Sequence, residues 1–327
     1  MVNEKKKEEV RGTFEFLKDW GDGMTRWTER WIPDALVIVI VLSLVTYIFA
    51  LIWGFKPEVS IGSRAYESIQ AWGKGFWELL AFAMQMCLIM MTGYILACSP
   101  PVRRLLDGLS GWSNPEKPWQ AILIMSLFSM IAAWLNWGLS LIASAMLALF
   151  IVKRNPKVDY RLLVAAAYLG LGCTWHAGLS GSATLLVATP DNFLIKGKLL
   201  DATIPVADTI FHPFNLILTV IIIAVVTILM VLMHPRPEKV FVVKPELMDQ
   251  LKLYEAPPKP TQWESPSEWM NWWPGFNLIV SIGGLIWLIW HFSTRGMDLN
   301  LNVINFAMLM LGILFHWRPW SFLKATE

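Results

Sequence analysis

Two long segments without formal charge carry polar residues and glycine at their centres. The first contains no Asp, Glu, Lys or Arg over the 34 residues 119–152, and its middle reads Asn136-Trp137-Gly138. The second is uncharged over 162–190, and its middle, residues 174–182, is rich in Gly, Ser and Thr. Irregular backbone is tolerated in a bilayer only where protein buries it or water reaches it. A pair of interrupted apolar segments therefore indicates a transport site.

The polar groups of these two interruptions suit a small anion and a cation. Helix N-termini favour negative charge, whereas unwound carbonyl groups and hydroxyls suit Na⁺. Because neither segment contains Lys or Arg, a small monocarboxylate fits better than a substrate with several negative charges. The predicted substrate or ion ligands are Asn136, Trp137, Gly138, Gly178, Ser180, Gly181, Ser182, Thr184, Thr189 and Asn192, with Gln85, His176 and Asp191 as further candidates. We expect any Na⁺ to bind at Asn136 and residues 180–192, and we predict no other metal and no cofactor.

Several of these residues also have a structural interpretation. A Gly- and Ser-rich run such as 178–182 is typical of a close-packing helix face, and Asn136 could hydrogen-bond a neighbouring helix. His176 could carry protons, but we favour a packed, hydrogen-bonded side chain. Gln85 lies in the middle of an apolar run, where it either faces the site or bridges two helices, and we favour the bridge.

The rest of the chain predicts an all-α polytopic membrane protein. Hydrophobic residues make up 55% of the 327 residues and charged residues only 16%, a composition typical of this class. A spanning helix needs about 20 mostly apolar residues. Together with the second broken segment, about six spans are predicted, the others being the apolar runs 34–53, 76–98, 214–233, 275–292 and 302–317.

The first broken segment is predicted to fold back on itself. Basic residues lie at both of its ends, at 103–117 and 153–161, and basic loops prefer the cytoplasm. A straight helix over 119–152 would be about 51 Å long, whereas the hydrocarbon core is about 30 Å thick. A re-entrant hairpin with Asn136 at its tip satisfies both constraints. The alternative is a single tilted or kinked span, which would invert the topology of everything that follows.

These predictions divide the chain into six parts. Basic residues before the first span predict a cytoplasmic N-terminus, and the stretch 56–74 is predicted as a loop. The parts are an interfacial amphipathic segment (1–33), the first two spans with a cytoplasmic loop (34–118), the hairpin (119–152), the broken span with the substrate loop and the next span (153–233), a cytoplasmic Pro-rich linker (234–273), and the last two spans with a cytoplasmic end (274–327).

Short motifs distributed over almost the whole chain resemble the bacterial short-chain fatty acid transporter family, carriers associated with acetoacetate and butyrate uptake. They are Trp31-Ile32-Pro33-Asp34, Gly75-Phe76-Trp77-Glu78-Leu79-Leu80-Ala81-Phe82, Met84-Gln85-Met86, Asn136-Trp137-Gly138, Ser180-Gly181-Ser182 and Ala188-Thr189-Pro190-Asp191-Asn192. More distantly, a hairpin with a central Asn followed by Thr184, Leu185, Pro190 and Asn192 is similar to the divalent anion/Na⁺ symporters. The resemblance implies an ion-transporter-like fold and assigns Asn136 and the loop 178–192, including Pro190, to the site. It also implies that only the first of two inverted repeats is complete and that the family's C-terminal part is absent.

The predicted function is secondary transport of short-chain fatty acids by alternating access in the bacterial inner membrane, coupled to Na⁺ or H⁺. The expected partners are a small monocarboxylate, the lipid bilayer, and either further copies of this chain or a missing C-terminal half; nucleic acid is not expected. One alternative is a non-transporting half-carrier that acts as a subunit. A remote alternative is a membrane-embedded hydrolase that uses Ser180 or Ser182 with His176, which would need the two side chains within hydrogen-bond reach.

Overall fold

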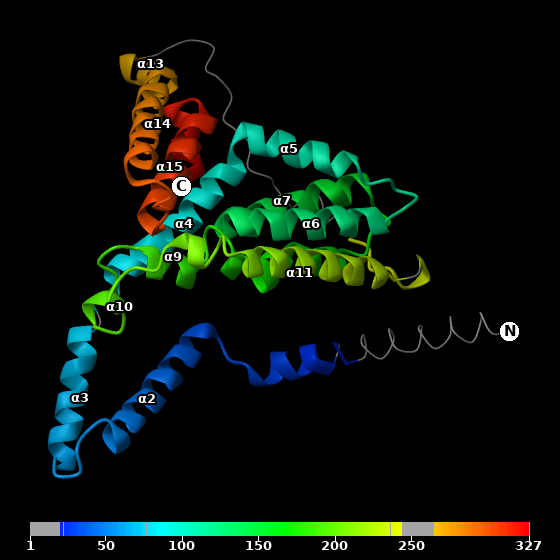
Figure 1. Ribbon diagram of the computed structural model, residues 1–327. Coiled ribbons are helices and arrows are strands. Elements are labelled where there is room, and N and C mark those ends of the chain that lie inside the picture. The colour runs from blue at the N-terminus through cyan, green and yellow to red at the C-terminus, as the bar shows by residue number, and fades with distance from the viewer. Residues whose placement is uncertain (1–19, 22, 76, 236, 244–264, 327) are drawn as a thin grey trace. The chain divides into compact units, whose positions relative to one another are not determined.

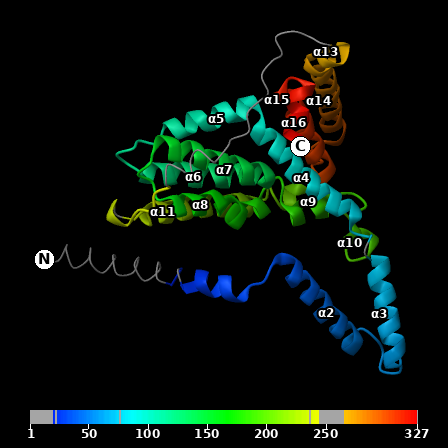
Figure 2. The ribbon, with the colours of Figure 1, turned by 180° about the vertical axis from the view of Figure 1, so that it is seen from behind.

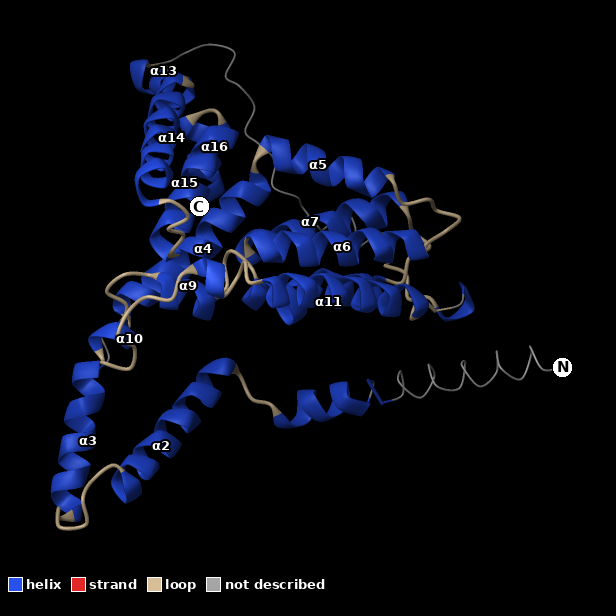
Figure 3. Cartoon of the chain, viewed as in Figure 1, coloured by secondary structure: helices blue, strands red, loops and turns tan. Residues whose placement is uncertain are grey.

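The computed structural model describes residues 20–21, 23–75, 77–235, 237–243 and 265–326. Among these residues the regular elements are all helices, as Figure 3 shows. They form two compact units, residues 1–80 and 81–327. The all-α prediction is confirmed, and the candidate site lies entirely within the second unit.

The first unit contains helices α2 (Ala35–Trp53) and α3 (Ile61–Gly75). The turn between them is held by Arg64, whose guanidinium donates hydrogen bonds to the carbonyls of Leu51, Lys56, Pro57 and Val59. Helix α3 corrects the prediction of a loop over 56–74. Of the predicted interfacial segment, residues 23–31 are helical, and residues 1–19 lie outside the described part of the chain.

The second unit is built from longer helices and one interrupted segment (Figures 1 and 2). Its helices are α4 (Leu80–Cys98), α5 (Pro100–Gly111), α6 (Trp119–Leu135), α7 (Trp137–Arg154), α8 (Tyr160–Leu169), α9 (Ser182–Ala188), α10 (Phe193–Lys196), α11 (Pro213–Leu232), α13 (Pro266–Trp272), α14 (Gly275–Arg295), α15 (Leu301–His316) and α16 (Pro319–Thr326). Helix α5 was predicted as part of a loop. It is amphipathic: it buries Leu106 and Ser110, whereas Arg104 and Asp107 are exposed.

Six helical segments of the described chain are long and apolar enough to cross a membrane. They are Leu36–Trp53, Leu80–Cys98, Trp137–Arg154, Tyr160–Lys196, Pro213–Leu232 and Gly275–Arg295. The apolar runs predicted as unbroken spans all form helices, the last being the shorter helix α15 with 16 residues. These observations support a multi-pass membrane protein.

Helices α6 and α7 form a hairpin. Ser140 Oγ donates a hydrogen bond of 2.7 Å to the carbonyl of Ser129, although 11 residues of straight helix would hold the two about 16 Å apart. At the outer ends, Asn155 Nδ2 donates to Ser113 Oγ at 2.8 Å. Figures 1 and 2 show the two helices side by side. The alternative of a single tilted or kinked span is therefore wrong.

Entry of both hairpin arms from one side of the membrane is a prediction that cysteine labelling can test. In a background with Cys87, Cys98 and Cys173 replaced by serine, Lys117→Cys and Lys153→Cys should both react with an impermeant maleimide from the cytoplasmic side. Both lysines are exposed at the outer ends of the arms. Asp201→Cys, in the exposed loop before α11, should react from the opposite side. Labelling of positions 117 and 153 from opposite sides would rule out the re-entrant hairpin.

The interrupted segment changes helix type earlier than predicted. The α-helix α8 gives way to a π-helical stretch at Gly170–Thr174, then to a 3-10 turn at Trp175–Ala177, before the chain loops to α9. The sequence predicted unwinding only near Trp175, followed by loop structure to Asn192, whereas α9 is helical. The π-helical stretch begins at Gly170, where the backbone packs closely on α6: a Cβ atom there would lie 2.2 Å from the carbonyl oxygen of Ser129.

Part of the predicted linker 234–273 is tied to the hairpin bundle. The buried carboxylate of Asp159 accepts hydrogen bonds from the backbone N–H groups of Leu162 and Phe241. His234 lies beside Asp159, and burial lowers the pKa of its imidazole. Its Nδ1 lies 3.0 Å from the carbonyl of Pro235, so the neutral ring carries its proton there. Residues 244–264 of the linker lie outside the described chain.

Candidate functional site

The two interruptions meet at the tip of the α6–α7 hairpin. The N–H of Leu179 donates to the carbonyl of Trp134 at 2.7 Å. The N–H of Trp137, the first residue of α7, donates to Ser180 Oγ at 2.8 Å. These bonds join two parts of the chain that are 43 residues apart. The loop 178–181 is thereby fixed against the hairpin tip.

Asn136 combines a capping function with an unused donor. Its side-chain Oδ1 accepts the N–H of Leu139 at 2.8 Å and so caps the N-terminus of α7. This bond sets the orientation of the amide, since only the oxygen can accept. The residue is fully buried, and its Nδ2 has no hydrogen-bond partner among the described residues. A buried N–H group without a partner costs about 1–3 kcal/mol, so this position is suited to a ligand that supplies an acceptor.

Trp137, the following residue, carries a second unused donor. Its side chain is half-buried, and its indole Nε1 is enclosed without a partner among the described residues. The positive end of the α7 helix dipole lies at the same point, because Trp137 is the first helical residue. Two neutral donors and a helix N-terminus favour a single negative charge.

Glycines let three backbones approach closely around the tip. A Cβ atom at Gly93 of α4 would lie 2.3 Å from the nitrogen of Leu139, and one at Gly138 would lie 2.7 Å from the carbonyl oxygen of Ile89. A Cβ atom at Gly178 would lie 2.1 Å from the carbonyl oxygen of Trp134. This close approach agrees with the close-packing interpretation of Gly178, and its assignment as a ligand residue stays a prediction.

The far end of the predicted site is separate and uses its own polar groups. Asn192 Nδ2 donates to the carbonyls of Leu186 and Thr189, and its Oδ1 accepts two N–H groups as the N-cap of α10. Thr189 Oγ1 donates to Leu185 and accepts from the N–H of Leu301 at 3.1 Å. Helix α9, with seven residues, holds this end about 10 Å from the hairpin tip. Thr189 thus links α9 to α15, and Asn192 orders the turn between α9 and α10.

Of the remaining loop candidates, Ser182 and Thr184 are partly buried, whereas Pro190 and Asp191 are exposed. Ser182 Oγ donates to Met86 Sδ at 3.3 Å, and Thr184 Oγ1 donates to the carbonyl of Gly181 at 3.2 Å. Pro190 and Asp191 lie away from the tip contacts.

The structure agrees with the prediction for Gln85 but not with the prediction for His176. Gln85 Nε2 donates to Asn302 Oδ1 at 2.7 Å, so it bridges α4 and α15 as favoured. The prediction of a packed, hydrogen-bonded His176 is wrong, because its side chain is exposed. The imidazole lies edge-on to the ring of the neighbouring Trp175. Two residues before His176, Thr174 is buried and its Oγ1 donates to the carbonyl of Met130 on α6 at 2.8 Å. Neither Ser180 nor Ser182 forms a hydrogen bond with His176 among the described residues.

An apolar cluster lies directly beside the two unused donors. Its buried members include Ile89 and Leu185, and Met86, Trp134, Trp137 and Leu179 pack against them. We call these six residues the tip cluster. Ile89 and Leu185 are fully buried, so the members that can contact a short hydrocarbon chain are the partly buried Met86, Trp134, Trp137 and Leu179.

Two contributors to this region were not predicted from the sequence. Trp134 supplies the carbonyl that holds Leu179, and Gly93 brings α4 against the tip. Gly93 was detectable as a glycine inside an apolar run, a position that often indicates close approach of another helix. The role of Trp134 depends on backbone geometry at the end of α6, which residue type does not reveal.

Comparison with known proteins gives the same family that the motifs suggest. The family described as short chain fatty acid transporter matches residues 16–327. A protein of Escherichia coli K12 is 37% identical over 305 residues, which cover 93% of this chain and 66% of the relative. A protein of Haemophilus influenzae is 30% identical over 306 residues, which cover 92% of this chain and 66% of the relative. Both are named as candidate short-chain fatty acid transporters.

No solved structure matches the chain. The chain spans 66% of the length of each of the two relatives. The family match itself runs to residue 327, and it does not support the expectation that the family's C-terminal part is absent. With matching residues from 16 to 327, the chain belongs to the short-chain fatty acid transporter family.

Proposed function

We propose that this chain binds short-chain monocarboxylates such as butyrate or acetoacetate at the hairpin tip and carries them across the bacterial inner membrane. The observation that carries the proposal is the pair of buried, unpaired N–H donors at Asn136 and Trp137. Both names given to the curated relatives refer to short-chain fatty acids, which agrees with this chemistry.

The carboxylate would accept hydrogen bonds from Asn136 Nδ2 and Trp137 Nε1. A hydrogen bond to a charged group contributes about 1.5–3 kcal/mol, and the ligand would also relieve the cost of two enclosed donors. The absence of Lys and Arg from 119–152 and 162–190 favours one negative charge over several. A tricarboxylate would leave further charges without partners in this uncharged region.

The acyl chain would lie on the tip cluster. Burial of each CH₂ group contributes about 0.8 kcal/mol, so butyrate should bind more tightly than acetate. Movement of the hairpin and the loop 178–181 together, relative to the surrounding helices, would expose the site alternately to the two sides. The two hydrogen bonds between the loop and the hairpin tip, Trp137 N–H to Ser180 and Leu179 N–H to Trp134, support movement of the loop and the hairpin as one rigid body.

Coupling to Na⁺ or H⁺ and a cytoplasmic N-terminus belong to the same proposal. Na⁺ prefers oxygen ligands, and the side-chain oxygens at the tip end of the predicted cation region are Asn136 Oδ1, Ser180 Oγ, Ser182 Oγ and Thr184 Oγ1. The side-chain oxygens of Thr189 and Asn192 already accept backbone N–H groups, so any cation would bind at the tip end of 180–192.

Uptake by reconstituted protein tests the proposal. Proteoliposomes should accumulate labelled butyrate with saturation, and accumulation should respond to an imposed gradient of either Na⁺ or H⁺, which identifies the coupling ion. Protein-free liposomes give the background from butyric acid that crosses unaided. If folded protein gives uptake no higher than these liposomes under either gradient, the transport proposal for this chain is wrong.

A further inference from the structure

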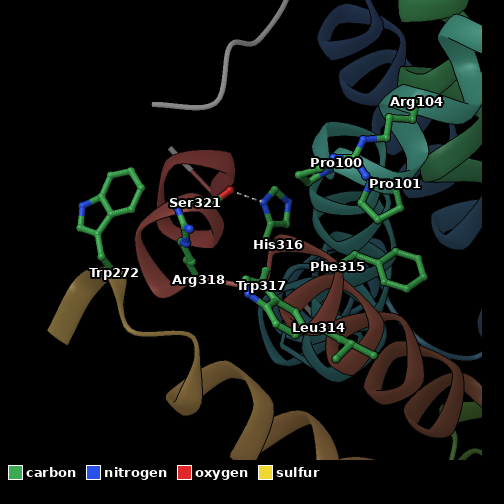
Figure 4. Close-up of a pocket in the computed structure, with 10 residues that line it drawn as sticks. All are labelled: Pro100, Pro101, Arg104, Trp272, Leu314, Phe315, His316, Trp317, Arg318 and Ser321. Carbon is green, nitrogen blue, oxygen red and sulfur yellow. Dashed lines mark hydrogen bonds between the residues drawn. The ribbon is translucent and has the colours of Figure 1, made fainter. Parts of the chain in front are cut away.

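A cavity of about 700 Å³ lies where α5 begins and where α13, α15 and α16 meet, as Figure 4 shows. None of its lining residues belongs to the hairpin tip or to the tip cluster. Its volume is in the usual range for a small-molecule site, about 300–1,000 Å³. The transport proposal gives this cavity no role.

The cavity is positively charged. Arg104 and Arg318 line it, and no Asp or Glu does. Neither arginine forms an ion pair with any residue in the described part of the chain. Helix α5 begins at Pro100 on the cavity wall, so the positive end of its dipole adds to this charge. The lining therefore selects an anion.

Arg318 is positioned by its surroundings. Its Cζ lies 5.2 Å from the ring centroid of the buried Trp272, a cation–π contact that holds the guanidinium. The preceding Trp317 has φ +63°, a left-handed conformation that side chains other than glycine rarely adopt. That turn ends α15 and directs the following residue back toward the cavity, where Figure 4 places Arg318.

Arg318, beside Ser321, and Arg104, beside Pro100 and Pro101, line different parts of the cavity (Figure 4), and each offers a site for a phosphate group. Each guanidinium presents a planar fork of N–H donors that matches two phosphate oxygens. Leu314 and Phe315 add an apolar wall, which a free inorganic ion would not use.

The position of the cavity indicates that the phosphate comes from a lipid. Apolar helices end around it: α4 ends at Cys98, α14 begins at Gly275 and α15 ends at His316. Trp272 and Trp317 line it, and tryptophan concentrates at the headgroup level of a bilayer. Basic pockets between spanning helices are typical binding sites for anionic headgroups. We propose that this cavity binds the phosphate group of an anionic phospholipid.

The test uses the full chain purified in a neutral maltoside detergent. Phosphatidylglycerol and phosphatidylcholine with identical acyl chains are titrated separately, and thermal unfolding and native mass spectrometry report binding. Phosphatidylglycerol should raise the unfolding temperature with saturation and remain bound in the gas phase, whereas phosphatidylcholine should do neither. The double variant Arg104→Gln/Arg318→Gln should raise the half-saturating phosphatidylglycerol concentration by about tenfold or more.

Two further variants separate the site from general charge. Lys153→Gln/Arg295→Gln removes the same charge from exposed positions and should bind phosphatidylglycerol like the parent. Arg104→Lys/Arg318→Lys keeps the positive charge but lacks the planar N–H donors of guanidinium. This variant should bind phosphatidylglycerol with intermediate affinity. Equal stabilisation by the two lipids, or unchanged binding by a folded Arg104→Gln/Arg318→Gln variant, would overturn the proposal. Full protection by millimolar inorganic phosphate, with no further effect of phosphatidylglycerol, would overturn the lipid assignment.

Discussion

Replacement of Asn136 by aspartate should abolish saturable butyrate uptake while the hairpin stays folded. The introduced carboxylate keeps the oxygen that accepts the N–H of Leu139, so the cap of α7 is preserved. The unused Nδ2 donor is replaced by a second oxygen. That oxygen carries negative charge where the substrate carboxylate would lie, and like charges repel strongly at buried positions.

Asn136→Ser is the matched variant for this prediction. Serine is a good N-cap, but it lacks the amide donor and adds no charge. Loss of one hydrogen bond to a charged group should weaken butyrate binding by about 10- to 100-fold, as measured by equilibrium binding of labelled butyrate. Thermal unfolding of the ligand-free protein checks that both variants fold. Parental affinity in Asn136→Ser would show that the amide does not contact the substrate.

The second large effect is expected at Gly178. A methyl group there would lie 2.1 Å from the carbonyl oxygen and 2.5 Å from the Cα of Trp134, and neither backbone atom can move cheaply. Gly178→Ala should therefore displace the loop 178–181, weakening the bonds of Leu179 to Trp134 and of Ser180 to Trp137. Overpacking of this kind typically costs about 1–3 kcal/mol. We expect a lower unfolding temperature together with loss of uptake.

Gly172→Ala provides the control within the same interrupted segment. A Cβ atom at Gly172 meets nothing within 4 Å, so this variant should unfold and transport like the parent. If the two variants have the same unfolding temperature and the same uptake, the contact between the loop and the hairpin tip is not required.

The apolar spans could be predicted because length and hydrophobicity alone specify them. The run 214–233 corresponds to α11 and the run 275–292 to α14, with ends that differ by a few residues. The hairpin could be predicted because basic residues at both ends and a central Asn136 restrict the topology. Helices α3 and α5 were missed because amphipathic helices with several charges resemble loops when only hydropathy is considered.

The candidate site was predicted only in part. The contact between the hairpin tip and the loop at Ser180 follows from two interruptions in one membrane bundle. The sequence could not show that both the oxygen and the nitrogen of the Asn192 amide form hydrogen bonds within its own loop, because these bonds depend on backbone geometry. It also could not show that Asn136 leaves a donor unused, or that His176 faces outward.

A crystal structure with 4-bromobutyrate would test the central claim most directly, because anomalous scattering locates the bromine independently of the electron-density interpretation. We predict a bromine peak against the partly buried members of the tip cluster, with the carboxylate within hydrogen-bond distance of Asn136 Nδ2 and Trp137 Nε1. A bromine peak away from the tip cluster, with Asn136 Nδ2 still unpaired or bonded to a protein carbonyl, would contradict the proposed site.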